Sequence, residues 1–407
     1  MTGNRNQSLR TILRVMRNGL FIALVIVIGM SASCRKQDNE TEAEPGFQQP
    51  LVTPVSNVDS ALIQWSDTVL LWLGSMQLEN GLLATSYESN LISLYDNALS
   101  VCAFVSAGQY DKAEHILSFF KARLNSEMLY GSGGYFQFRN ASGPQGNRWL
   151  GDNAWLLIAI HNYEDATGDL QFSEMKLALD NWIRAQQDVD GGVNGGTESS
   201  GAVIGKVTEG MIDAFNAVRG FDAFHAGVLT YLREERWDTI DRLPVSWPGS
   251  DYYYALDNFS WGYCALEGFP DRVLNDADRF LNAQFHVPSQ QPINGYCFDE
   301  DRDAVWLEGT AQMAIAFLKS GDAARANTVL REVAKARVVQ SQWPGIFGIP
   351  YATNQGTGYG GGLLWNGVDS QPATASSCWY VMACREFDPM QLNYGKGVPD
   401  EMEFWSE

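Results

Sequence analysis

The feature that most limits the fold of this chain is a helical rhythm that repeats about every 50 residues. From residue 59 onward, apolar residues recur at helical spacing, and two kinds of connection alternate between the helical stretches. One kind is a very short turn that contains a glycine, as at residues 107–109, 167–169 and 320–322. The other kind is long and rich in Gly, Trp, Tyr, Asn and Asp, and it covers residues 125–151, 188–207, 241–256, 285–304 and 339–373.

Short turns make antiparallel helical hairpins, so the alternation places all the long loops on one face of the fold. The helix after each long loop is apolar nearly all round, whereas its partner is amphipathic, as an inner and an outer layer of helices require. We therefore expect an all-α toroid, an (α/α)6 barrel of six helical hairpins spanning residues 59–390, followed by a C-terminal tail over 391–407. Helices are predicted near residues 59–77, 94–107, 110–124, 152–167, 170–187, 208–220, 222–240, 257–268, 270–284, 305–319, 322–338 and 374–386.

Nearly every inner helix of this barrel begins with an acidic residue. Because the inner helices all run in the same direction, these carboxylates should meet at one rim of a central pit. Helix capping and the helix dipole would explain an acid at a helix start equally well. That explanation is weaker for the two glutamates, since Glu is a poorer cap than Asp and a glycine, costly in a first turn, follows each. The residues are Asp96, Asp152, Glu209, Asp257 and Glu308.

Such a rim suits the cleavage of glycosidic bonds, which needs one protonated and one ionised carboxyl group. We expect Glu308 or Glu209 to be the general acid and Asp152 or Asp96 to be the base. Trp306 is close to Glu308 in the sequence, and an apolar neighbour of this kind raises the pKa of a carboxyl group, as a general acid requires.

A sugar ring also needs flat apolar platforms with polar edges, and the long loops are rich in aromatic residues. Many of these residues must be structural, so only part of the set is expected to bind substrate. We expect substrate contacts from Asp257 and from a group of aromatic residues comprising Trp149, Trp247, Tyr253, Trp306 and Trp365.

Charge and motif spacing exclude several other functions. The formal net charge of −20 disfavours nucleic acids and polyanionic sugars. The acidic stretches at residues 188–192 and 299–303 lack the spacing of a calcium loop, and we expect solvated turns there instead. The glycine run at 358–362 follows no strand and lacks the Lys and Ser/Thr of a phosphate loop. We therefore predict neither a metal nor a cofactor.

The first residues predict export. Basic residues precede the apolar run 20–30, which small residues and Cys34 follow, as in a secretory signal over residues 1–33. The end of this segment is similar to the bacterial lipobox, with Ser31 where a leucine is usual, and the similarity implies that Cys34 is acylated. An ordinary cleaved signal with an incidental cysteine is the alternative. The composition of residues 34–58 predicts a flexible tether. We therefore expect an exported monomer that only its lipid holds at a bacterial membrane. The expected location is the outer membrane, the periplasm or the cell surface.

Several of these motifs together resemble those of the bacterial six-hairpin glycosidase-like proteins. The motifs are Tyr95-Asp96-Asn97-Ala98-Leu99, Gly151-Asp152-Asn153-Ala154-Trp155, the glycine turn at 167–169, residues 186–192, and Trp306-Leu307-Glu308-Gly309-Thr310. The resemblance spans about residues 60–390 and implies an (α/α)6 barrel. It is less specific for activity, because the superfamily includes inverting glycoside hydrolases, polysaccharide lyases and sugar epimerases.

Histidine placement helps to choose among these activities. Epimerases and many lyases of this architecture use His or Tyr to transfer protons, whereas none of the four histidines here is expected at the pit: His115, His161, His225 and His286. The leading hypothesis is therefore a glycoside hydrolase that acts on an oligo- or polysaccharide with two carboxylates and inverts the anomeric centre. A non-catalytic glycan-binding lipoprotein and a tyrosine-dependent polysaccharide lyase remain as alternatives.

Overall fold

The computed structural model describes residues 56–406 except 248–251, 341, 343 and 357–368. The predicted signal sequence, the Cys34 anchor, nearly all of the tether and the candidate residue Trp365 lie outside the described residues.

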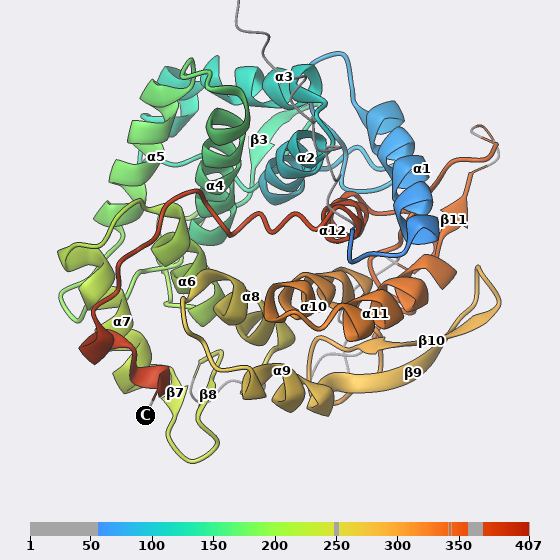
Figure 1. The fold of residues 1–407 in the computed structure, drawn as a ribbon. Helices are drawn as coiled ribbons and strands as arrows, with labels where there is room; N and C mark the ends of the chain where they lie inside the picture. Colours follow the sequence, from blue (N-terminus) through green and yellow to red (C-terminus); the bar gives the residue numbers. More distant parts are fainter. Residues whose placement is uncertain (1–55, 248–251, 341, 343, 357–368, 407) are drawn as a thin grey trace, which may run out of the picture. The chain divides into compact units, whose positions relative to one another are not determined.

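The inner layer is a closed ring of helices. Each inner helix contacts the next one, and the last packs against the first, so the ring has no open edge (Figure 1). In chain order its members are α2 (Leu94–Ser106), α4 (Leu150–Thr167), α6 (Thr208–Ala217), α8 (Leu256–Ala265), α10 (Leu307–Ser320) and α12 (Thr374–Cys384).

The outer layer supplies one partner for each inner helix. α1 packs on α12, which joins the two ends of the barrel into the sixth hairpin. The outer helices are α1 (Ser60–Met76), α3 (Tyr110–Lys121), α5 (Ser173–Ala185), α7 (Ala223–Glu235), α9 (Arg272–Asp276) and α11 (Ala323–Lys335). The predicted all-α (α/α)6 architecture is confirmed.

Burial explains why each helix lies in its layer. Every residue of α12 is buried, and α4 is buried without interruption from Leu150 to Glu164. An outer helix such as α11 buries one stripe, which includes Ala326, Leu330 and Val333, and leaves its opposite face in water. The glycine turns also behave as predicted, because Gly168 and Gly321 end α4 and α10 in the left-handed conformation at φ 72° and 85°.

The helix predicted over residues 270–284 is wrong in its second half. α9 ends at Asp276, a single 3-10 turn follows, and residues 281–286 form strand β9 (Leu281–His286), which pairs antiparallel with β10 (Gln291–Tyr296). This pairing supplies the backbone hydrogen bonds that a helix would otherwise make, and it buries Ile293 and Tyr296. Local periodicity cannot reveal a partner strand that lies ten residues further along.

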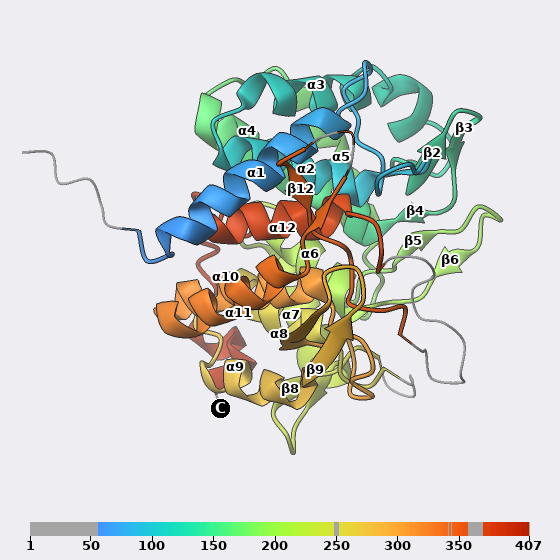
Figure 2. The ribbon, with the colours of Figure 1, turned by 90° about the vertical axis from the view of Figure 1, so that its right-hand side faces the viewer.

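The long loops contain further short antiparallel strands, which the sequence did not indicate. Several of them end where an inner helix begins, and β2 to β6 lie together at one end of the barrel (Figure 2). They are β1 (Ile92–Ser93), β2 (Phe138–Asn140), β3 (Gly143–Gln145), β4 (Arg148–Trp149), β5 (Gly196–Thr197), β6 (Val203–Ile204), β7 (Trp237–Asp238), β8 (Leu243–Pro244), β11 (Val338–Val339) and β12 (Phe347–Gly348).

The opposite end of the ring is crossed by the C-terminal segment (Figure 1). Two inner helices hold its backbone, because Asn162 Nδ2 donates to Pro389 O over 2.9 Å and Asn216 Nδ2 donates to Met390 O over 3.1 Å. The tail then packs its last aromatic residue, Trp405, against the barrel with 1% exposure. The strand-rich end holds the cavity that the first turns of the inner helices line.

None of the helices in the described part of the chain has both the length and the apolar character needed to cross a membrane.

Candidate active site

The predicted acids lie in the first turns of the inner helices rather than at their capping positions. The residues that precede the helices are others, such as Ser93, whose Oγ accepts a hydrogen bond from the backbone N–H of Asp96 over 3.2 Å. Capping therefore does not explain the acids. They are the second or third residue of α2, α4, α6, α8 and α10: Asp96, Asp152, Glu209, Asp257 and Glu308.

The asparagines that follow two of these acids hold the neighbouring loops. Asn97 Oδ1 accepts from Leu83 N over 2.9 Å, and its Nδ2 donates back to Leu83 O over 3.0 Å. Asn153 does the same to Tyr135, over 2.8 and 3.1 Å. In these two Asp-Asn pairs the Asn side chain therefore hydrogen-bonds to a loop backbone as a neighbouring strand would, and it holds that loop in place. The neighbouring Asp side chain remains available to the site.

Four of the five acids line one cavity of about 330 Å³ at the strand-rich end of the ring. These four are Asp152, Glu209, Asp257 and Glu308. Asp96 lines an adjoining cavity, and its carboxyl group is still close enough to Glu308 and Asp152 for their charges to raise its pKa. The sequence therefore predicted a real convergence of acids.

Below the acids, the pit has an aromatic floor. Trp155 is central, with ring centroids 5.7 Å from Tyr95, 5.5 Å from Trp261 and 5.4 Å from Trp379, each in an edge-to-face arrangement. The three indoles are at most 3% exposed. The floor keeps water out from below and lowers the local dielectric around the carboxyl groups.

Glu308 is held from one side only. Tyr95 Oη donates to Glu308 Oε1 over 2.7 Å and in turn accepts from Trp379 Nε1 over 3.0 Å. Gln312 Nε2 also donates to Oε1, over 3.3 Å. The other oxygen, Oε2, has no hydrogen-bond partner among the described residues. Burial raises the pKa of Glu308 to about 7, although the Tyr95 hydroxyl lowers it in part.

The other acids are shifted in the same direction. Burial raises the pKa of Asp152 to about 7, against the lowering effect of the Tyr95 backbone N–H, which donates to Asp152 Oδ1 over 3.2 Å. Burial also raises the pKa of Asp257 to about 7. The pKa of Glu209 rises well above its ordinary value through burial and the charges of Asp257, Asp152 and Glu308. Near neutral pH the site therefore holds both protonated and ionised carboxyl groups.

A further acid, Asp213, lies one turn below Glu209 on α6 and was not predicted. It is 0% exposed, and neither carboxyl oxygen has a hydrogen-bond partner among the described residues. Its Oδ2 would lie 3.2 Å from a Cβ at position 151, so a larger residue there would press on this carboxyl group. Burial and the charge of Glu209 raise the pKa of Asp213 well above its ordinary range.

No basic side chain among the described residues lines this cavity or the adjoining one. The histidines lie elsewhere, as expected. His161 Nε2 contacts Ala217 O over 3.1 Å, His225 belongs to the capping box of α7, and His286 contacts Ser289 and Asp369. His115 lies on the exposed face of α3.

The predicted aromatic platforms divide into two groups. Trp149 and Trp306 line the cavity, and Trp306 packs so tightly over Gly309 that a Cβ there would lie 2.1 Å from its ring. Trp247 and Tyr253 do not line it; Tyr253 Oη instead donates to Asp238 Oδ2 over 2.9 Å. The two acids of the stretch at 188–192 are about half exposed, and both form ion pairs with Lys206: Asp188 and Asp190. No group of side chains among the described residues is arranged to hold a metal ion.

The cavity residues that sequence reasoning missed come from the inner helices and from the connections between them. Trp155 follows Asp152 by three positions, a spacing that places both on one helix face and could have revealed it. Tyr95 was part of a recognised motif but received no role. Phe138, Phe298 and Tyr351 also line the cavity, and they come from loops with no periodicity to interpret.

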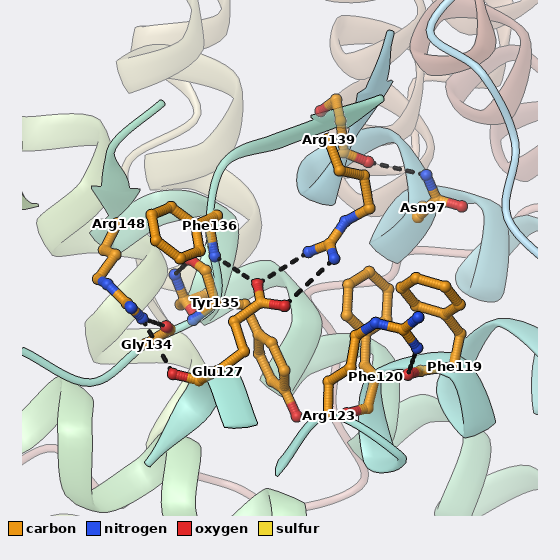
Figure 3. A network of polar contacts seen from close by, with 12 residues as sticks. Asn97, Phe119, Phe120, Arg123, Glu127, Gly134, Tyr135, Phe136, Arg139 and Arg148 are labelled. Carbon is orange, nitrogen blue, oxygen red and sulfur yellow. Dashed lines mark hydrogen bonds and ion pairs between the residues drawn. The ribbon is translucent and has the colours of Figure 1, made fainter. Parts of the chain in front are cut away.

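A buried ion pair anchors the loop that brings several of these residues to the site (Figure 3). Glu127 accepts from both terminal nitrogens of Arg139, over 3.0 and 3.2 Å, and from Phe136 N over 2.8 Å. Arg148 donates to the backbone oxygens of Glu127 and Gly134. The network fixes residues 127–148, which carry Gln137 and Phe138 into the cavity wall.

Comparison with known proteins supports the fold. No protein-family model and no curated protein matches the chain. Similar solved structures include a glycosidase variant in complex with glucose (13% identical, covering 81% of this chain and 98% of the other, TM-score 0.53). An α-amylase from Clostridium perfringens is 10% identical over 80% of this chain and 97% of the other, with TM-score 0.53. A sugar epimerase from a ruminal bacterium is 9% identical over 80% and 98%, with TM-score 0.56. At these identities the likeness shows the shared fold.

Proposed function

We propose that this protein is a carbohydrate-active enzyme, a glycoside hydrolase that cleaves an oligo- or polysaccharide with two carboxyl groups. The observation that carries the proposal is the convergence of four carboxyl groups, without a basic partner among the described residues, in one cavity walled by aromatic rings. Aromatic faces suit the apolar faces of sugar rings, and carboxyl groups with raised pKa values suit acid and base catalysis.

In this mechanism Glu308 is the general acid. Its Oε1 accepts hydrogen bonds from Tyr95 and Gln312, which leaves the proton for Oε2. The Glu308 proton goes to the glycosidic oxygen as the bond from that oxygen to the anomeric carbon breaks. Asp152, stabilised in its ionised form by the Tyr95 backbone N–H, takes a proton from the water molecule that attacks the same carbon. We propose inversion at this carbon, as the resemblance to the six-hairpin proteins implies.

The remaining acids bind substrate in this proposal. Burial and the charges of Asp257, Asp152 and Glu308 raise the pKa of Glu209 well above its ordinary value, which favours its protonated form. A protonated Glu209 donates a hydrogen bond to a sugar hydroxyl, and Asp257 accepts one. Trp149 and Trp306 provide faces on which a ring can stack.

The alternatives fit the site less well. A tyrosine that abstracts a proton in a lyase needs a lowered pKa, whereas burial and the neighbouring Glu308 raise the pKa of Tyr95 well above its ordinary value. A lyase acting on uronates would also need basic side chains, and the described lining has none. The structurally similar proteins named above are glycosidase, amylase and epimerase, which supports a sugar substrate. An epimerase with a catalytic histidine is disfavoured because no histidine lines the cavity among the described residues.

We also propose, from the sequence alone, that the chain is exported and anchored through an acyl group on Cys34. Metabolic labelling with a fatty-acid analogue should mark the wild type and fail to mark Cys34→Ala.

The proposed function is tested by reducing-end release from a panel of α- and β-linked gluco-, manno- and galacto-oligosaccharides. The assay uses a soluble form of the protein that starts after Cys34. Hydrolysis of at least one glycan is expected. Binding to a glycan without any release would instead support the non-catalytic alternative, and an unsaturated product that absorbs ultraviolet light would support a lyase.

A further inference from the structure

A second cavity of about 360 Å³ adjoins the acid-lined one at the strand-rich end of the barrel. The two cavities share Ser93, Phe138 and Tyr351 as walls. They therefore meet at the strand pair of β1 and β2, where Ser93 lies opposite Phe138. A ligand of more than one ring can extend from one cavity toward the other along this boundary.

The second cavity is built from fixed backbone. A β-bridge joins Ser86 to Ala373 across its wall, and Thr374 Oγ1 donates to Ala84 O over 2.6 Å. Strands β1 and β2 form the side that faces the acids. Because these elements come from three separate parts of the chain and are tied to each other, the cavity is preformed and does not need a ligand to shape it.

The lining differs from that of the first cavity. A single carboxyl group, that of Asp96, faces small hydroxyl side chains, Gln371, and an apolar surface that includes Ala375. The Asp96 carboxyl oxygens accept no hydrogen bond from the described residues, although the side chain is only 8% exposed. A buried carboxyl group without a hydrogen-bond partner is a place for a ligand hydroxyl, because its carbonyl oxygen accepts a hydrogen bond in either protonation state.

We propose that the second cavity is a subsite that binds the sugar unit next to the one held among the four acids, with Asp96 accepting hydrogen bonds from its hydroxyl groups. The inference rests on the proposed function and deepens it. The substrate is then a chain of at least two sugar units, and Asp96 is a binding residue. This role differs from the base that the sequence suggested for Asp96.

The test fills the second cavity and leaves the first one unchanged. Ala375→Phe places a ring in the second cavity, and Ala265→Phe is the matched control, because Ala265 lines a cavity at the opposite end of the ring. Both are made in the Glu308→Gln background so that ligand is not consumed. Calorimetry measures the binding of glucose, of its disaccharides maltose and cellobiose, of mannose and of the mannose disaccharides. A thermal melt first establishes that each variant is folded.

The expected result is that a disaccharide binds about tenfold more tightly than its monosaccharide, and that Ala375→Phe removes this gain while Ala265→Phe keeps it. Monosaccharide affinity stays the same in both. A disaccharide that gains nothing over its monosaccharide, or a gain that survives Ala375→Phe, overturns the subsite and leaves the proposed function intact. Binding of no probe to the parent Glu308→Gln protein overturns both.

A milder variant covers the case in which the phenylalanine prevents folding. In the active enzyme, Asp96→Asn should raise KM for disaccharides about tenfold with kcat nearly unchanged, since it replaces one acceptor oxygen with an NH2 donor and so weakens the ligand contact. A loss of kcat of a hundredfold or more with unchanged KM would make Asp96 the catalytic base and overturn the inference.

Discussion

Two groups of buried carboxylates in this barrel are treated in opposite ways. Glu127 is 4% exposed and is fully compensated, with both oxygens bound by Arg139 and one also by Phe136 N (Figure 3). Glu308 is 1% exposed and has one oxygen bound by the neutral side chains of Tyr95 and Gln312, whereas the other oxygen has no hydrogen-bond partner among the described residues. The same chemical group therefore serves structure in one place and is left available in the other.

The difference shows where the barrel tolerates an energetic cost. A buried carboxylate is expensive unless a cation or several donors compensate it. Arg139 meets that need at Glu127, and Lys176 supplies a cation to Glu164. Within the pit, among the described residues, the chain supplies no cation and raises the pKa values instead. Acids that lie together in one cavity without a cationic partner indicate a binding or catalytic site.

The largest effect is expected on catalysis, when the acid of the pit is replaced. Glu308→Gln should reduce kcat about 10²- to 10⁴-fold, because it removes the proton donor, while leaving the melting temperature at or above that of the wild type. The measurement pairs reducing-end release with a thermal melt. Retention of full turnover on an accepted glycan would refute the assignment of Glu308.

The same substitution at Glu127 should reduce stability and leave activity nearly unchanged. Glu127→Gln leaves Arg139 buried with only neutral acceptors, so the free energy of unfolding should fall by about 3–5 kcal/mol. Chemical denaturation measures this loss, and activity per folded molecule should change little. If Glu127→Gln instead unfolds at the wild-type denaturant concentration, the two groups do not differ as described.

The third prediction concerns pH and stability. Asp152, Asp257 and Glu308 have pKa values of about 7 in the folded chain and near 4 when unfolded, so the folded chain binds more protons between these values. Their stabilising contribution is complete below about pH 4 and is lost as the pH rises through about 7.

The wild type should therefore lose ~2–3 kcal/mol of stability from each of these groups between pH 5 and pH 8. The combined variant Asp152→Asn with Glu308→Gln should show a smaller loss than the wild type over the same range. Comparing the two proteins cancels the opposing contribution of the buried histidines, whose pKa values are lowered. Parallel stability curves for the two would count against raised pKa values in the pit.

The smallest effect belongs to the hydrogen bond that joins the aromatic floor to the acid. Tyr95→Phe removes the donor that lowers the pKa of Glu308, so that pKa should rise and the alkaline limb of the pH–rate profile should move to higher pH. At neutral pH kcat should fall only about tenfold, because one positioning contact is lost. An alkaline limb that moves to lower pH would show that Tyr95 does not stabilise the ionised form of Glu308.

The sequence could reveal the features of the site that depend on local helical periodicity. It could not reveal those that depend on contacts between residues far apart in the chain. The acids of the pit were predictable, because helical periodicity fixes the layers and the layers fix the direction of every inner helix. Asp213 was not, since a single acid inside an apolar helix has no pattern around it. The strands β9 and β10 and the placement of Tyr253 against Asp238 depend on pairing between distant residues. Trp155 could have been found, because its spacing of three from Asp152 places both residues on one helix face.

The central claim is that the carboxyl groups of the pit keep their protons to neutral pH because they are buried and no basic side chain in the described part of the chain lines their cavity. Isotope-edited NMR with glutamate labelled at the carboxyl carbon tests it most directly, with Glu308→Gln identifying the Glu308 signal and Glu127→Gln as the control. The account predicts that the Glu308 signal titrates at about pH 7 and is absent from Glu308→Gln. A Glu308 signal that titrates near the ordinary value of 4.5 would contradict it.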